Sequence, residues 1–247
     1  MATHAEHRGA LSNGAGQEFD RWRSSTRVFL QPIAAPSILG LFGFAAATFM
    51  VATNIAGWYG NTHSGVYLFP FAAVFGGGAQ FAAGMWAYRA RDGMATAVHG
   101  MWGSFWIAYG ILWLLVAAGD LTVPAPKFPE LAFWFFPLAA LTFSAAVASV
   151  GQNLGVTSTL ISLAGGSACL AIGYLVGSSA WLHTGGWILF ASSICAFYTA
   201  SAMMWKSSFG RVILPLGEPR AKANVPGHLY THPIEYHEGE PGVRQGQ

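Results

Sequence analysis

Few residues of this 247-residue chain could perform acid–base or nucleophilic chemistry. No carboxylate pair, HExxH sequence, cysteine cluster or nucleophile elbow is present. Cys169 and Cys195 lie in apolar runs, which is typical of small buried side chains. His228, His232 and His237 lie in a polar, Pro- and Gly-rich stretch that offers no rigid metal site. The sequence therefore predicts neither an enzyme nor a metal or other cofactor.

The polar side chains that could act on a small molecule lie inside apolar segments. Gln80 follows a glycine run, and an amide in hydrocarbon is costly unless paired, so it is expected to face protein or water. Its amide could bond a neighbouring helix or donate to a substrate. His99 could be a hydrogen-bonded residue near a helix end or a proton relay. Both are candidates for the polar lining of a pore.

An aromatic stripe follows His99 at helical spacing. It consists of Trp102, Trp106, Tyr109 and Trp113, with intervals of four, three and four residues. Such a stripe fits lipid contact, core packing, or the wall of a conduit. Small residues crowd the segments around Gly76–Gly78 and Gly165–Gly166, which is typical of close helix packing in lipid. That packing could lie within one subunit, between subunits or along a pore.

Long apolar segments must position these residues. The chain is 53% hydrophobic and only 9% charged, whereas soluble domains carry about 25% charged residues. Crossing a bilayer takes about 20 apolar residues. Six stretches qualify, at about 37–56, 66–88, 94–118, 131–151, 156–180 and 186–205. The sequence predicts an all-α integral membrane protein with a six-transmembrane-helix bundle.

The basic residues predict the orientation of this bundle. Six spans place both termini on one side, and eleven of the twelve Lys and Arg residues lie there, whereas Lys127 alone lies opposite. The positive-inside rule therefore predicts cytoplasmic termini in a plasma or inner membrane. We expect an N-terminal tail (1–36), a membrane domain (37–206) and a cytoplasmic C-terminal tail (207–247), with 1–36 and 219–247 largely disordered. A net charge of +2 argues against a nucleic-acid partner.

Four short strings carry a family resemblance. AAPSILGLFGF (34–44), FGGGAQFAAG (75–84), WGSFW (102–106) and FGRVILPLGE (209–218) occur in that order along the six spans. Together they resemble the acetate uptake transporter family, whose members include bacterial acetate–succinate and yeast acetate/ammonia transporters. The first string contains the signature positions Pro36, Leu39, Gly40 and Leu41.

The resemblance implies a homo-hexamer in which each six-helix subunit has its own conduit for small carboxylates. It implies an apolar constriction at Phe44, Leu163 and Trp102, the last in place of a tyrosine. Ala196 matches a small residue of the sixth helix that influences substrate size.

The chain also departs from the family pattern. Ala35 stands for an asparagine, Ile38 for a proline, and Ala87 and Met203 for glutamates. Loss of the glutamates weakens any scheme in which a protein carboxylate carries a coupling proton. Trp102 can donate through its indole N–H but has no hydroxyl.

These observations favour a transporter or channel for acetate, or also succinate, in which the proton travels on the substrate. Spans without charge favour a neutral acid, or an anion that keeps part of its water and bonds Gln80, Trp102 or the first amides of the first helix. The alternatives are ammonia or ammonium transport, and a membrane sensor or assembly protein that transports nothing.

Overall fold

The computed structural model describes residues 33–217, and the statements below concern that range. The chain divides into two units, residues 1–34 and Ala35–Gln247, and every described helix lies in the second. The tails predicted at 1–36 and 219–247 fall almost entirely outside the described residues.

Six long apolar helices make up the described part of the second unit, which contains no strand between residues 35 and 217. The first is α2 (Pro36–Ile55). The second span runs through three consecutive segments, α3 (Ser64–Phe71), η1 (Ala72–Ala79) and α4 (Gln80–Arg89). The others are α5 (Gly93–Ala118), α6 (Pro129–Ser149), α7 (Leu154–Val176) and α8 (Ser179–Phe209). The prediction of six helices that are long and apolar enough to cross a membrane is confirmed.

Local sequence signals determine where these helices begin and end. Asp92 caps α5 by accepting a hydrogen bond from the Ala95 N–H at 2.9 Å, and Asn153 caps α7 through the Val156 N–H at 2.8 Å. α2 begins at Pro36, whose missing N–H costs nothing at that position. α5, α7 and α8 each end at a left-handed glycine.

The predicted boundary between the last two spans was wrong. We expected spans at 156–180 and 186–205, but α7 ends at Val176 and α8 begins at Ser179. Gly177, with φ +72°, reverses the chain within two residues. The polar stretch containing His183 and Thr184 is therefore the first part of α8, and Trp181 belongs to that helix.

The second span contains an unpredicted π-helical segment. Pro70 lies inside α3 and lacks a backbone N–H, so it disturbs the normal i to i−4 bonding. The wider η1 follows directly and includes Gly76, Gly77 and Gly78, which are weak α-helix formers. At Gly76 this backbone lies against α2 and α5: an added Cβ would lie 2.7 Å from Ala47 Cβ and 2.9 Å from Trp106 Cδ1.

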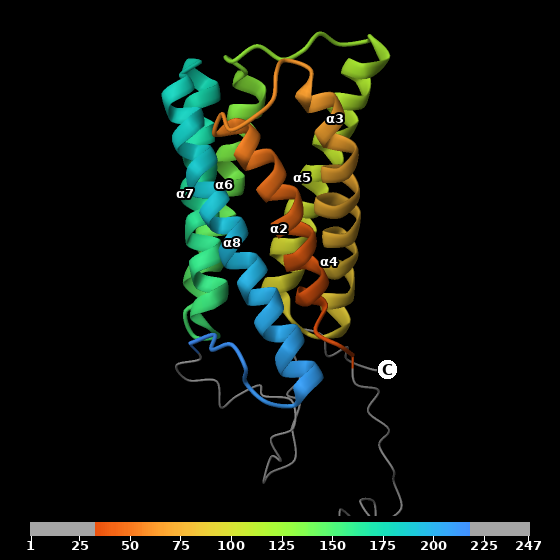
Figure 1. The fold of residues 1–247 in the computed structure, drawn as a ribbon, viewed down its shortest axis with the longest axis vertical. Coiled ribbons are helices and arrows are strands. Elements are labelled where there is room, and N and C mark those ends of the chain that lie inside the picture. The colour runs from red at the N-terminus through yellow and green to blue at the C-terminus, as the bar shows by residue number, and fades with distance from the viewer. Residues whose placement is uncertain (1–32, 218–247) are drawn as a thin grey trace, which may run out of the picture. The chain divides into compact units, whose positions relative to one another are not determined.

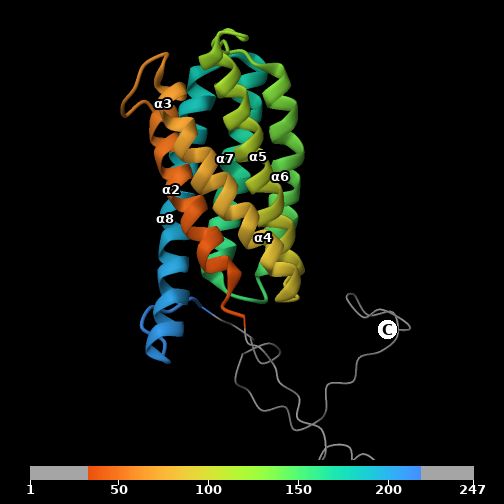
Figure 2. The same cartoon turned by 90° about the vertical axis from the view of Figure 1, so that its right-hand side faces the viewer.

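The six spans lie side by side as a bundle (Figures 1 and 2), and the packing of neighbouring helices closes this bundle into a ring. Going round it, α2 packs on α8, α8 on α7, α7 on α6, and α6 on α5. α5 packs on α4 and η1, which pack back on α2. The contact between α5 and α6 is the sparsest of the ring. Because the ring closes, side chains that point inward are shielded from lipid.

Glycines allow the helices of this ring to approach closely. A Cβ on Gly84 of α4 would lie 2.7 Å from the Gly100 nitrogen of α5. A Cβ on Gly186 of α8 would lie 2.6 Å from the Ala56 nitrogen, at the end of α2. The small residues therefore support packing within the subunit, one of the readings that the sequence allowed. Gly78 and Gly165 have open or nearly open space around them.

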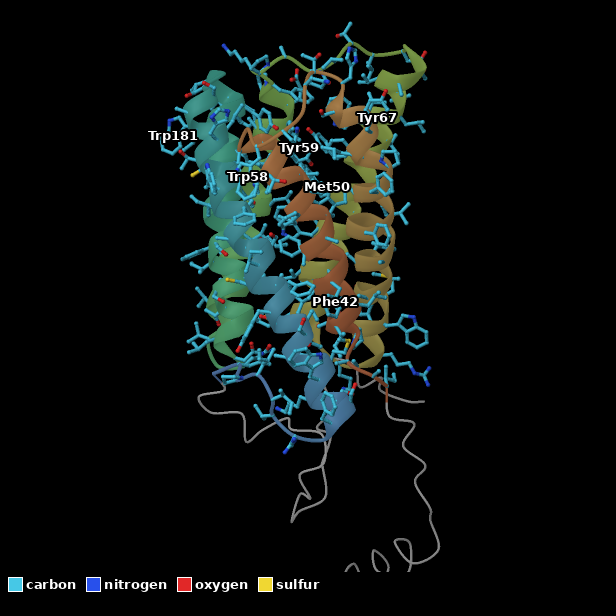
Figure 3. All side chains as sticks on the ribbon, viewed as in Figure 1. Phe42, Met50, Trp58, Tyr59, Tyr67 and Trp181 are labelled. Carbon is cyan, nitrogen blue, oxygen red and sulfur yellow. The ribbon has the colours of Figure 1, made fainter. Side chains whose placement is uncertain are left out.

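The two ends of the ring differ in composition. One end holds Arg89, Arg91, Lys206 and Arg211, and we call it the basic end. The other end holds Trp58, Tyr59, Trp181 and Trp187, and we call it the aromatic end; Figure 3 shows Trp58, Tyr59, Tyr67 and Trp181 toward it. The exposed fractions are 43–50% for the four side chains of the aromatic end, Trp58, Tyr59, Trp181 and Trp187. The rings of Trp58 and Trp187 lie 5.1 Å apart. This arrangement fits an interfacial aromatic belt.

A short closing segment, residues 210–217, follows α8 and returns to the start of α7. The N–H groups of Leu154 and Gly155 donate to the carbonyls of Gly217 and Leu216, at 3.0 and 3.1 Å. The Tyr198 hydroxyl donates to the Pro215 carbonyl at 2.8 Å. Leu216 is only 8% exposed. The closing segment is thus part of the packed structure.

Candidate functional site

Three large apolar side chains meet inside the ring at one level of the bundle. Phe44 comes from α2, Trp102 from α5 and Leu163 from α7, and each is 2% exposed. The rings of Phe44 and Trp102 pack edge to face with their centroids 6.4 Å apart. Trp102 and Leu163 line the same wall of a cavity. We call these three residues the constriction.

A hydrogen bond to a fourth helix fixes Trp102. Its indole N–H donates to the Thr142 hydroxyl of α6 at 2.9 Å, and that hydroxyl donates to the Leu138 carbonyl at 2.6 Å. The indole N–H is therefore engaged within the protein, unlike the free substrate donor that the sequence allowed. This bond also crosses the sparsely packed boundary between α5 and α6.

One cavity lies between the constriction and the basic end. Its volume is about 490 Å³, which includes space open to solvent. Its lining is mixed: Ser37, Leu41, Met94, Ala95, Val98, His99, Gln152, Asn153, Val156, Thr159, Leu160 and Met203. His99 is 4% exposed, and its Nδ1 has no hydrogen-bond partner. We call this space the basic-end cavity.

A second cavity, the aromatic-end cavity, lies beyond the constriction and has a volume of about 400 Å³, which includes space open to solvent. Its lining is Thr48, Val51, Ala52, Ile55, Trp102, Phe105, Trp106, Tyr109, Phe135, Leu163, Leu170, Tyr174 and Leu189. Two buried donors in this wall, the Thr48 hydroxyl and the Trp106 indole N–H, have no partner. Buried polar groups are normally paired, so both are available to a bound molecule.

The order of residues along the helices places the constriction between these cavities. Each helical turn takes about 3.6 residues. Leu41 and Leu160 line the basic-end cavity one turn before Phe44 and Leu163. Thr48 lines the aromatic-end cavity one turn after Phe44. α2, α5 and α7 run in the same direction, so the three helices give the same order. We call the two cavities, together with the apolar side chains at the level between them, the interior path.

The aromatic stripe of α5 faces this interior. Trp102 and Trp106 are 2% and 4% exposed and line the aromatic-end cavity together with Tyr109. The lipid-facing interpretation of the stripe is therefore wrong for these residues. Trp113 continues the stripe and stacks on Phe69 at 5.3 Å, but it lines neither cavity.

The remaining predicted site residues lie around the path. Gln80 is 1% exposed, so it faces protein, and its Oε1 has no partner, although it lines neither cavity. Ala196 is fully buried in α8 and also lies outside both linings. Gly40 and Leu41 are buried, Pro36 is half-buried and Leu39 is 51% exposed. The signature positions thus lie on different faces of α2.

Sequence reasoning missed Thr48, Thr142 and Tyr174. Each is a polar residue in a span, but none stands in a motif. For Thr48 a signal was available, since it follows Phe44 by four residues and so lies on the same helix face. No comparable signal linked Thr142 to Trp102, because the two lie forty residues apart and meet only through the packing of α6 on α5.

The chain is similar to known proteins in both sequence and structure. The GPR1/FUN34/yaaH family matches residues 23–217. The chain belongs to this family. The predicted resemblance to acetate uptake transporters is confirmed, since the relatives carry that activity in their names. A curated relative, the succinate-acetate/proton symporter SatP of Escherichia coli K12, is 29% identical over 189 residues, which cover 75% of this chain and 96% of the relative.

Two further similar proteins extend this comparison. An uncharacterized protein of Methanothermobacter thermautotrophicus is 28% identical over 206 residues, covering 78% of this chain and 96% of its own length. The structure of the bacterial acetate channel SatP superposes with a TM-score of 0.69 at 25% identity and covers 75% of this chain and all of the channel chain.

The four positions at which the resemblance implies departures from the family pattern lie in the half of the bundle toward the basic end. Ala35 and Ile38 flank the start of α2, where no side chain caps the helix. Met203 lines the basic-end cavity, whereas Ala87 is fully buried in α4.

Proposed function

We propose that this chain is a multi-pass membrane transporter or channel for short monocarboxylates, with acetate as the main cargo. The observation that carries the proposal is the interior path: two cavities without a charged lining residue, separated by the Phe44–Trp102–Leu163 constriction. The names of the relatives, a succinate-acetate/proton symporter and an acetate channel, support the substrate class.

The apolar constriction favours passage of acetate as the neutral acid. A bare carboxylate in a dry apolar passage loses hydration worth many kcal/mol. Protonation is cheaper: an acid with a pKa near that of Glu, about 4.3, requires roughly 3.7 kcal/mol for protonation at pH 7. No Lys or Arg lines either cavity to offset a negative charge. We therefore propose that transport is proton-linked, with the proton on the substrate while it crosses the constriction.

A flux assay tests both the cargo and the proton linkage. Purified protein in liposomes should accumulate labelled acetate when the outside is more acidic than the inside. At a fixed total acetate concentration, raising the external pH by one unit above 6 should lower uptake about tenfold, because the neutral fraction falls by that factor. Uptake that is insensitive to an imposed pH gradient contradicts proton linkage.

The same vesicles distinguish the alternative functions. Ammonia flux without acetate flux would favour an ammonia conductor. The absence of both fluxes, from protein shown to be folded and inserted, would favour a sensor or assembly protein. Succinate uptake measured alongside acetate tests how far the substrate range extends.

The orientation and assembly of the chain are also proposals. The basic end carries Arg89, Arg91, Lys206 and Arg211, and the aromatic end carries Lys127, which supports a cytoplasmic basic end in the plasma or inner membrane. Family membership supports a homo-hexamer with one path per subunit. Cysteine labelling of intact cells at positions 91 and 127, and the mass of the detergent-solubilised particle, test these two points.

A further inference from the structure

The basic-end cavity contains one ionisable side chain whose role the proposed path leaves unassigned. His99 lines the cavity, is 4% exposed, and has an Nδ1 atom without a hydrogen-bond partner. An unpaired polar atom at this depth destabilises the protein unless something binds it. Ser37, Asn153 and Thr159 supply further polar atoms to the same lining.

The position of the imidazole is fixed by α2. A Cβ on Gly40 would lie only 2.5–2.7 Å from three atoms of the His99 ring. The ring therefore lies directly against the α2 backbone, at a place where only glycine leaves room for it. Ring orientation is set by this contact before any ligand arrives, which reduces the entropy lost on binding.

The start of α2 offers a second set of donors beside His99. α2, α5 and α7 all begin at the basic end, and their first turns contribute Ser37, Ala95 and Val156 to the cavity lining. The Asp92 carboxylate already caps α5, and Asn153 caps α7.

Two further amides of α7 donate to the closing segment. Of the three helices that begin at the basic end, α2 alone has no side-chain cap. The first turn of a helix carries a partial positive charge, and its free N–H groups attract an anion. In α2, Pro36 has no N–H and the Ile38 N–H donates to the Ala35 carbonyl at 3.2 Å, so the Ser37 N–H is the amide of this turn that can donate to a ligand.

We infer that the basic-end cavity is a carboxylate-binding site, in which the His99 imidazole N–H donates to one oxygen of a short monocarboxylate and the Ser37 N–H in the first turn of α2 donates to the other. The inference rests on the proposed function and names the residues that select its substrate. No charged side chain lines the cavity, so hydrogen bonds rather than an ion pair hold the anion. Such binding is weak enough for the ligand to leave toward the constriction.

Two substitutions of one residue test the inference on the full-length protein. His99→Phe keeps a planar ring against Gly40 and removes both nitrogens. His99→Asn restores a polar group near the position of Nδ1. His183→Phe, at an exposed histidine of α8 outside both cavities, is the matched control.

Acetate binding and transport are measured separately. Binding is followed by saturation transfer from the detergent-solubilised protein to the acetate methyl group. Transport is followed as the concentration dependence of labelled acetate uptake into liposomes. We expect His99→Phe to weaken binding and raise KM by about fivefold, the size expected for one lost hydrogen bond. His99→Asn should stay within about twofold of wild type, and His183→Phe should match it.

Each outcome decides the inference. Wild-type KM and binding in a folded His99→Phe protein overturn it while leaving the proposed transport intact. If His99→Phe weakens acetate binding and the wild-type protein shows no acetate flux, the site is supported and the proposed transport is overturned. Absence of acetate binding to the wild-type protein overturns the site. Should His99→Phe fail to fold, acetate titration of wild-type protein with ¹⁵N-labelled histidine decides, since the His99 ring signal must shift.

Discussion

The two cavities of the path have similar sizes but different walls. The basic-end cavity has a histidine, two amides and two hydroxyls among aliphatic and methionine side chains, and it lies among three helix starts. The aromatic-end cavity is lined by Trp106, Tyr109 and Tyr174 together with aliphatic side chains, and its free donors are Thr48 and Trp106. The first resembles a site for an anion, and the second a passage for a molecule that has lost its charge.

This difference assigns a separate task to each side of the constriction. Polar selection can take place in the basic-end cavity, where donors face the ligand. We propose that size selection takes place at Phe44, Trp102 and Leu163, whose side chains are each 2% exposed. A neutral acid then meets a largely apolar wall, which costs it little hydration. The predictions below test this division, beginning with the largest expected effect.

Removing the constriction should abolish the division. Trp102→Ala joins the two cavities, so longer acids should enter, and the ratio of butyrate to acetate uptake should rise by about tenfold or more. Loss of the buried indole should also lower the free energy of unfolding by about 3–5 kcal/mol. Parallel uptake of the two acids and a thermal melt measure these effects. Trp187→Ala, at an exposed tryptophan, is the control, and an unchanged ratio in Trp102→Ala would remove Trp102 from the constriction.

Displacing His99 without changing it should impair the basic-end cavity alone. In Gly40→Ala the new Cβ would lie 2.5–2.7 Å from the imidazole, so the ring must move. We expect KM for acetate to rise about threefold to fivefold, with a stability loss of about 1–3 kcal/mol from overpacking.

A matched glycine and a double variant provide the controls for this prediction. Gly165→Ala, with its nearest atom at 3.9 Å, should behave as wild type. In a His99→Ala background, Gly40→Ala should add no further change in KM. An additional loss in that background would mean that Gly40 acts independently of His99.

The smallest expected effect concerns the aromatic-end cavity. Thr48→Val removes a buried hydroxyl that has no partner, so the free energy of unfolding should rise by about 1 kcal/mol. If this hydroxyl donates to the passing acid, Vmax should fall about twofold while KM stays constant. Chemical denaturation and uptake kinetics report the two changes. A more stable protein with unaltered Vmax would show that the passage needs no donor there.

The six spans were predictable because apolar length depends on composition over about 20 residues. The start of α8 was not predictable from hydropathy. The hydropathy pattern does not show that α7 ends before Gly177 and that the chain reverses within two residues, nor that the polar stretch around His183 is helical. Segment η1 was equally hidden, since a π-helix has no clear composition of its own and arises here from Pro70 and the packing of Gly76.

The site was predictable only in part. Sequence pattern put Trp102 and His99 on one face of a helix, and the structure puts both in the interior. Pairings between distant segments were out of reach, as for Trp102 with Thr142 and His99 with Gly40, because they depend on how helices pack. The family resemblance predicted Phe44 and Leu163 as site residues. The periodicity of α2 and α7 alone gave no reason to choose these two residues.

The closing segment has a consequence for biogenesis. The Leu154 N–H donates to the Gly217 carbonyl, and the Gly155 N–H donates to the Leu216 carbonyl. The ribosome adds these two acceptor residues only after all of α8 has been made. The beginning of α7 consequently lacks these two acceptors throughout the insertion of the last helical hairpin. Truncation before residue 216 should leave a protein whose hairpin inserts but whose end at α7 stays open to proteolysis.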